Sequence, residues 1–109
     1  MFKILNNNYM LAVKGDTAMF DITLENYTFT EGDRVYFTVK KRIKDSQYVI
    51  QKVVDVFKEN TAKVYLTTED TNIEPGLYVY DIQVSLTNGI VDTIVLPSKF
   101  EILEGVTCE

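Results

Sequence analysis

The feature that most constrains the fold of this 109-residue sequence is a strict two-residue alternation that follows Pro75-Gly76. Apolar or aromatic side chains take every second position of this stretch, and the positions between them are mostly polar. This period is typical of a β-strand with one buried face, because successive side chains of a strand point to opposite faces of the sheet. The predicted inner row is Tyr78, Tyr80, Ile82, Val84 and Leu86, and the outer row is Val79, Asp81, Gln83 and Ser85.

Most of the remaining chain is also predicted to form β-strands. Segments 17–24, 34–41 and 61–67 repeat the alternation, and 9–13, 90–96 and 100–103 are further strand candidates. The predicted inner rows of the three alternating segments are Ala18, Phe20, Ile22 and Leu24; Val35, Phe37 and Val39; and Ala62, Val64 and Leu66. In 34–41 the predicted outward residues are Tyr36, Thr38 and Lys40. About seven short strands separated by regular turns are typical of an all-β sandwich. The strongest turn signals are Lys14-Gly15-Asp16, Glu31-Gly32-Asp33, Lys58-Glu59-Asn60 and Asn88-Gly89.

The start of the Tyr-rich strand favours an immunoglobulin-like antiparallel β-sandwich. Its Gly-x-Tyr-x-Tyr pattern places Tyr78 where such sandwiches have a tyrosine corner, whose hydroxyl hydrogen-bonds to backbone upstream. The chain is 46% hydrophobic and has room for one core, so residues 1–109 are predicted to form a single domain. Within it, residues 1–8 are predicted to be an arm or a short first strand, and 104–109 a mobile tail.

Two segments are harder to assign. In residues 48–57 the spacing of Ile50, Val53, Val54 and Phe57 fits a helix, but the β-branched residues favour a strand with a bulge near Val53-Val54. Residues 68–74 are predicted to form one short helical turn before the Tyr-rich strand. Thr71 and Glu74 there have the spacing of a capping box.

The hairpin around Asn88-Gly89 has two candidate registers. A two-residue turn pairs Ile82 with Val95 and turns Ile94 and Leu96 outward. A three-residue turn, Thr87 to Gly89, pairs Leu86 with Ile90, buries Ile94 and Leu96, and turns Val91 and Val95 outward. We favour the three-residue turn because the same alternation of inward and outward residues then continues past Pro97 without a switch.

Either register leaves an apolar row on the outer face of the sheet, beside outward residues of neighbouring strands. Scattered exposed apolar side chains are ordinary on protein surfaces. A contiguous apolar patch, in contrast, usually marks a protein–protein interface. The predicted candidate interface is Tyr36, Val79, Val91 and Val95.

The residues needed for most enzyme chemistry are scarce, so we predict that the protein is not an enzyme and carries no cofactor or metal. The sequence has no histidine, and it contains no phosphate-binding loop, CxxC or HExxH motif. The lone Cys108 excludes an internal disulfide. The acidic residues Glu69, Asp70 and Glu74 fit capping and solvation better than a calcium site.

Charge and hydropathy limit the partners that the sequence predicts. The net charge of −5 disfavours nucleic acid and anionic membranes, and the basic cluster Lys40-Lys41-Arg42 with Lys44 fits a solvated strand end. No signal peptide or membrane-spanning run is recognisable, so synthesis in a cytoplasm is expected.

Five stretches, in order along most of the chain, carry a resemblance to a known group of proteins. They are 14–20 (KGDTAMF), 31–41 (EGDRVYFTVKK), 69–71 (EDT), 78–83 (YVYDIQ) and 88–94 (NGIVDTI). Together they resemble small prophage-encoded immunoglobulin-like proteins of phage tail and baseplate gene clusters, which are similar to N-terminal modules of baseplate and receptor-binding proteins.

The resemblance implies a non-enzymatic structural or adaptor module of the virion, made in the bacterial host cytoplasm. Its implied partners are other tail or baseplate proteins, or a second copy of itself. It implies no catalytic residues, and without a fibre or receptor-binding domain it implies no host-binding head. The alternative is a carbohydrate-binding β-sandwich at a host cell surface, with Tyr27, Tyr48 and Tyr65 as the stacking platform.

Overall fold

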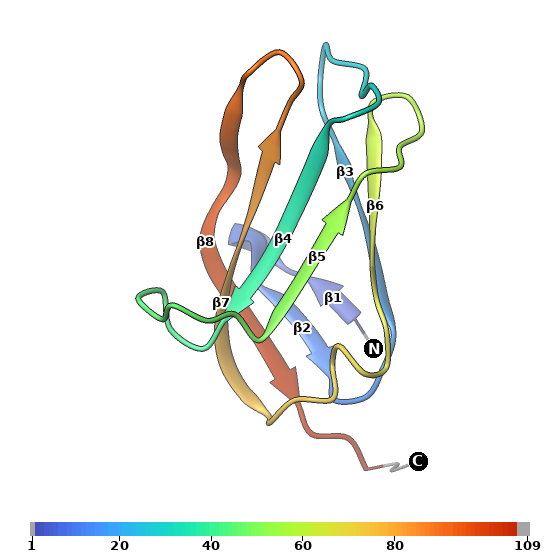
Figure 1. The fold of residues 1–109 in the computed structure, drawn as a ribbon. Coiled ribbons are helices and arrows are strands. Elements are labelled where there is room, and N and C mark those ends of the chain that lie inside the picture. Colours follow the sequence, from blue (N-terminus) through green and yellow to red (C-terminus); the bar gives the residue numbers. More distant parts are fainter. Residues whose placement is uncertain (1, 107–109) are drawn as a thin grey trace.

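The computed structural model describes residues 2–106 and shows a sandwich of two β-sheets (Figure 1). The larger sheet has six strands in the order β1-β2-β8-β7-β4-β5, and the smaller sheet pairs β3 with β6. The strands are β1 (Phe2–Ile4), β2 (Met10–Val13), β3 (Ala18–Thr23), β4 (Arg34–Lys40), β5 (Ile50–Val54), β6 (Thr61–Leu66), β7 (Gly76–Ser85) and β8 (Val91–Leu103), with a 3₁₀ turn η1 (Asn6–Asn8).

The predicted inner rows of β3, β4, β6 and β7 are confirmed as the core. Phe37 of β4 is fully buried at its centre, and its ring packs against those of Phe20, Tyr80 and Phe100. The core therefore joins β3 of the smaller sheet to three strands of the larger one. Its other fully buried members include Val35, Val39, Ala62, Val64 and Leu66.

The topology is that of an all-β sandwich, as the sequence predicts. All strand pairs are antiparallel except β2 and β8, which run parallel, with Met10 opposite Phe100. The Tyr78 hydroxyl donates a 2.5 Å hydrogen bond to the carbonyl of Glu74, which is the predicted tyrosine corner. Burial, followed by the nearby Glu74 carboxylate, raises the pKa of Tyr78.

The ends of the chain meet the predictions in part. Residues 2–4 form the short first strand β1, and Phe2 stacks on Phe20 across the sandwich edge. Of the predicted tail, Glu104 to Val106 are exposed and outside the strands. The remaining tail residues, including Cys108, lie outside the described part of the chain.

The β7–β8 hairpin combines the two registers that the sequence allows. Its turn is the favoured three-residue one, because the Leu86 amide donates to the Ile90 carbonyl at 2.8 Å. Register shifts near Ile82 then bring that residue opposite Val95, as in the two-residue alternative. The prediction that Leu96 is buried is therefore wrong, and its side chain is 71% exposed. Ile94 and Val95 both pack against the core, as two residues facing one partner do at a β-bulge.

Two local predictions need correction. Residues 50–54 do form a strand, but it pairs with β4 without a break, so the predicted bulge at Val53-Val54 is absent there. The capping box before β7 lies four residues earlier than predicted. The Thr67 amide donates to Asp70 Oδ2 at 2.8 Å, and the Asp70 amide donates to Thr67 Oγ1 at 3.1 Å. The helical turn that it caps is a single hydrogen-bonded turn at 68–71.

Candidate functional site

The structure separates the four residues of the predicted interface. Tyr36 and Val79 are half-buried on the outer face of the six-stranded sheet. Val91 is 62% exposed on the same face, near the β7–β8 turn. Val95 lies opposite the buried Ile82 and packs against the core, so its predicted outward orientation is wrong. The reason is the irregular β7–β8 register, which reverses the parity of β8 at this point.

An open groove with a volume of about 460 Å³ lies on this outer face, over β4, β5 and β7. The strand register brings its floor together, because Thr38 lies opposite Gln51 on one side and Asp81 on the other. Tyr36 likewise lies opposite Gln83. The groove is lined by Tyr36, Thr38, Lys40, Ser46, Tyr48, Gln51, Asp81 and Gln83.

The groove continues into a smaller hollow toward β8. The two share Thr38, Lys40 and Asp81, and the smaller one adds Ile43, Val79 and Pro97 among its lining residues. One depression therefore runs across the outer face between the β4–β5 loop (41–49) and the kinked part of β8, and its end toward β8 is more apolar.

Hydrogen bonding within the groove is sparse. Gln51 Nε2 donates to Thr38 Oγ1 at 3.2 Å. Within residues 2–106, the side chains of Lys40, Asp81 and Gln83 make no hydrogen bond or ion pair. The groove thus presents an ammonium, a carboxylate and a carboxamide whose hydrogen-bonding capacity is free for a ligand.

Three exposed apolar side chains also lie on the β7–β8 hairpin. We define the docking strip as Ile90, Val91 and Leu96, which are 52%, 62% and 71% exposed. Val91 points to the outer face, since it pairs with Ser85, an outward residue of β7. The strip includes one residue of the predicted interface and adds two that the sequence places elsewhere.

The tyrosines proposed as a sugar platform do not come together. Tyr27 lies in the β3–β4 loop and donates to Asp33 Oδ2 at 2.7 Å, a bond that raises the pKa of Tyr27. Tyr65 lies opposite Met19 on the outer face of the smaller sheet, on the far side of the sandwich from the groove. Only Tyr48 lines the groove, where its aromatic neighbour is Tyr36.

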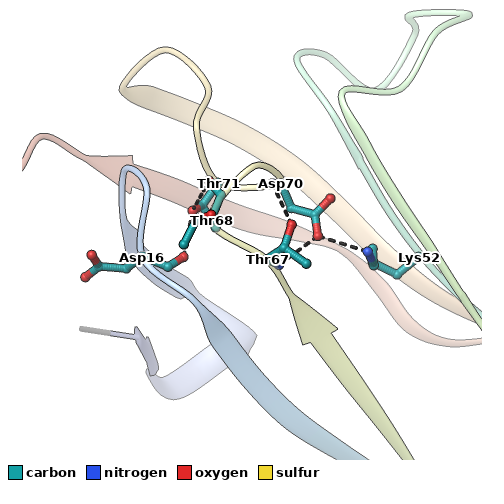
Figure 2. A network of polar contacts seen from close by, with 6 residues as sticks. All are labelled: Asp16, Lys52, Thr67, Thr68, Asp70 and Thr71. Atoms are coloured by element: carbon teal, nitrogen blue, oxygen red, sulfur yellow. Dashed lines mark hydrogen bonds and ion pairs between the residues drawn. The ribbon is translucent and has the colours of Figure 1, made fainter. Parts of the chain in front are cut away.

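Of the clustered carboxylates at the β6–β7 crossover, Asp70 has a structural role (Figure 2). Lys52 Nζ lies 2.9 Å from Asp70 Oδ2. Burial alone would raise the pKa of Asp70, but hydrogen bonds from Thr67 and Lys52 lower it below its usual value. The fully buried Thr71 donates through Oγ1 to the Asp16 carbonyl at 2.6 Å, which ties the crossover to the β2–β3 turn.

A buried carboxylate organises the opposite end of the sandwich, where the β3–β4, β5–β6 and β7–β8 loops meet (Figure 1). Asp33 is fully buried and accepts hydrogen bonds from the Thr30 amide, the Thr87 amide and the Tyr27 hydroxyl at 2.7–2.8 Å. Burial alone would raise the pKa of Asp33, but these donors outweigh it and lower the pKa to about 2. Asp33 therefore ties the β3–β4 loop to the β7–β8 turn.

The sequence places five of the eight groove residues on outward positions: Tyr36, Thr38, Lys40, Asp81 and Gln83. It assigns no binding role to the last four and interprets Lys40 as a solvated strand end. It names Tyr48 as a sugar-stacking residue, but together with the distant Tyr27 and Tyr65. The sequence signal for the groove is the run of polar outward residues on a central strand. This signal is not specific, because the solvent-facing side of an ordinary sheet also carries polar residues. The alternation does not predict where the β4–β5 loop lies, and this loop brings Tyr48 to the groove.

Comparison with known proteins adds no family to this description. No model of a known protein family matches the chain, and no curated protein matches its sequence. In the described residues, no group of three or more His, Cys, Asp or Glu residues could hold a metal ion. None of the helical segments within residues 2–106 is long and apolar enough to cross a membrane.

Proposed function

We propose that this chain is a non-enzymatic structural or adaptor module of a phage or prophage tail or baseplate. It acts by docking to other tail proteins or to a second copy of itself, and the virion is where it works. The tail context is supported by the five sequence stretches that resemble prophage-encoded immunoglobulin-like proteins. The docking mechanism is supported by one structural observation, the docking strip Ile90, Val91 and Leu96.

The strip is the part of the β7–β8 hairpin best suited to a protein partner. A lone exposed apolar residue is ordinary, but here three lie on one hairpin, each with more than half of its surface in water. Burying them against a partner is favourable by roughly 25 cal/mol per Å² of apolar area. Val91 is paired with Ser85 of β7, so its backbone loses little conformational freedom on docking.

Incorporation into particles tests the tail context. Particles induced from a host carrying the gene are purified and their proteins identified by mass spectrometry. The chain is expected among the tail proteins. Its absence from particles in which other tail proteins are detected would refute the virion assignment.

Self-association or partner binding tests the docking strip. The double variant Val91→Lys with Leu96→Lys is expected to lose the association that the wild type shows in size-exclusion chromatography with light scattering, or to drop out of particles. Val56→Lys is the matched control, because Val56 is 79% exposed on the β5–β6 loop, outside the strip. Normal assembly of the double variant would refute the strip as the docking surface.

A further inference from the structure

The groove on the outer face has a different chemistry from the docking strip. Its floor holds one cation, Lys40, and one anion, Asp81, and neither is paired within residues 2–106. Their charges cancel, so the groove has no net charge to attract an ionic ligand. Gln51 and Gln83 add carboxamide groups, and the two tyrosines add aromatic surface with hydroxyl tips.

A protein partner fits this floor poorly. The buried centre of a protein–protein interface is depleted in charged residues, and Lys and Asp are among the residue types that are disfavoured there. A protein laid over the groove would remove Lys40 and Asp81 from water, and each would need a new partner to offset its desolvation. The groove is therefore better matched to a small, hydrated ligand that supplies many hydrogen bonds.

We propose that this groove binds a neutral carbohydrate. A sugar hydroxyl both donates and accepts, so neighbouring hydroxyls can donate to Asp81 and accept from Lys40 while the carboxamide of Gln83 does either. The apolar C–H face of a sugar ring packs on an aromatic side chain, which Tyr36 or Tyr48 provides. The volume of about 460 Å³ lies within the range of small-ligand sites.

The groove is also held in shape before any ligand arrives. Asp81 and Gln83 alternate with the buried Tyr80, Ile82 and Val84 on a central strand, so their backbone is fixed by the core. The loop that carries Tyr48 is closed at its base by the Val49 amide, which donates to the Val39 carbonyl at 2.8 Å. Such preorganisation lowers the entropy cost of binding.

This proposal is independent of docking through the strip. The strip lies on the β7–β8 hairpin, whereas the groove lies over β4, β5 and β7. A module that docks through the hairpin can leave the groove open to solvent. Variants of one surface are accordingly expected to leave the function of the other intact.

The test is a titration of the full chain, labelled for two-dimensional NMR, with a panel of neutral sugars: glucose, galactose, rhamnose and N-acetylglucosamine. Glucuronic acid is the charged comparison, and an unrelated tail protein serves as a macromolecular probe. At least one neutral sugar is expected to shift the amide signals of Thr38, Asp81 and Gln83, with a Kd on the order of 1 mM.

Three variants complete the design. Tyr48→Ala and Asp81→Ala are each expected to weaken binding about tenfold or more, as the loss of a stacking surface or of a charged hydrogen-bond acceptor implies. Tyr65→Ala is the matched control, because Tyr65 is 47% exposed and Tyr48 is 55% exposed, but they lie on opposite faces. The control is expected to keep wild-type affinity.

Several results would overturn the proposal. One is the absence of saturable shifts from every neutral sugar at concentrations well above 1 mM. A second is equal loss of binding in Tyr48→Ala and Tyr65→Ala, and a third is tighter binding of glucuronic acid than of its neutral counterpart. Shifts of the groove amides by the protein probe alone would reassign the groove to protein docking. Retained sugar binding in Val91→Lys with Leu96→Lys supports the separation of the two surfaces.

Discussion

Replacing Asp33 by alanine is expected to lower the stability of the protein by about 3 kcal/mol. The carboxylate is fully buried and accepts 2.8 Å hydrogen bonds from the amides of Thr30 and Thr87, on two different loops. A hydrogen bond to a charged acceptor is worth about 1.5–3 kcal/mol. We take the low end for each amide, because Thr30 and Thr87 are themselves exposed and their amides can regain water.

The assay is urea denaturation followed by circular dichroism, with the thermal midpoint as a second readout. A loss of about 3 kcal/mol corresponds to a fall in Tm of roughly 12 °C for a domain of this size. Glu31→Ala is the control, because Glu31 lies in the same loop but is exposed, and a change within about 0.5 kcal/mol is expected. A loss below about 1 kcal/mol for Asp33→Ala would refute the view that Asp33 holds the two loops together.

The same carboxylate predicts how stability depends on pH. Its pKa is about 2 in the folded protein, against the ordinary value of 3.8. As pH falls through that window, the unfolded chain binds the proton first, so the stability contributed by Asp33 is present above pH 3.8 and lost toward pH 2. Urea midpoints measured from pH 5 to pH 2 are expected to fall less steeply for Asp33→Asn than for the wild type. Parallel curves would contradict the assignment.

Four further substitutions test three other parts of the fold. Tyr78→Phe removes the tyrosine-corner hydrogen bond of a buried side chain and is expected to cost about 1 kcal/mol in urea denaturation; an unchanged midpoint would show that the corner contributes nothing. Thr71→Val keeps the volume of a fully buried side chain but leaves a carbonyl of the β2–β3 turn without its donor, for an expected loss of about 1–2 kcal/mol. Val95→Lys is expected to lower Tm because that side chain packs against the core, whereas Val91→Lys is expected to leave Tm nearly unchanged. An unchanged Tm for both lysine variants would instead support the regular three-residue register, in which both valines point outward.

The candidate site shows where prediction from sequence stops. The outward positions of Tyr36, Asp81 and Gln83 follow directly from the alternation of their strands. Which of these outward residues lie side by side depends on strand pairing, which joins residues as distant in sequence as Thr38 and Asp81. The groove also needs the β4–β5 loop to place Tyr48, and a loop without periodicity carries no signal of its direction.

The capping box illustrates the same limit within a few residues. Thr67 with Asp70 and Thr71 with Glu74 have the same spacing, so sequence alone does not choose between them. Tertiary contacts decide, because Lys52 on β5 pairs with Asp70, and Thr71 is buried with its hydroxyl bound to the Asp16 carbonyl (Figure 2).

The sequence by itself determined the fold class, the inner rows of β3, β4, β6 and β7, and the tyrosine corner at Tyr78. These follow from local physics, since a strand with a period of two can bury only one of its faces. The tertiary structure alone decided the register shifts that bury Val95 and expose Leu96, and the assembly of the polar groove. The register shifts depend on how β8 accommodates extra residues against β7, and the groove depends on which strands become neighbours. Both features are determined only when the two sheets pack over one core.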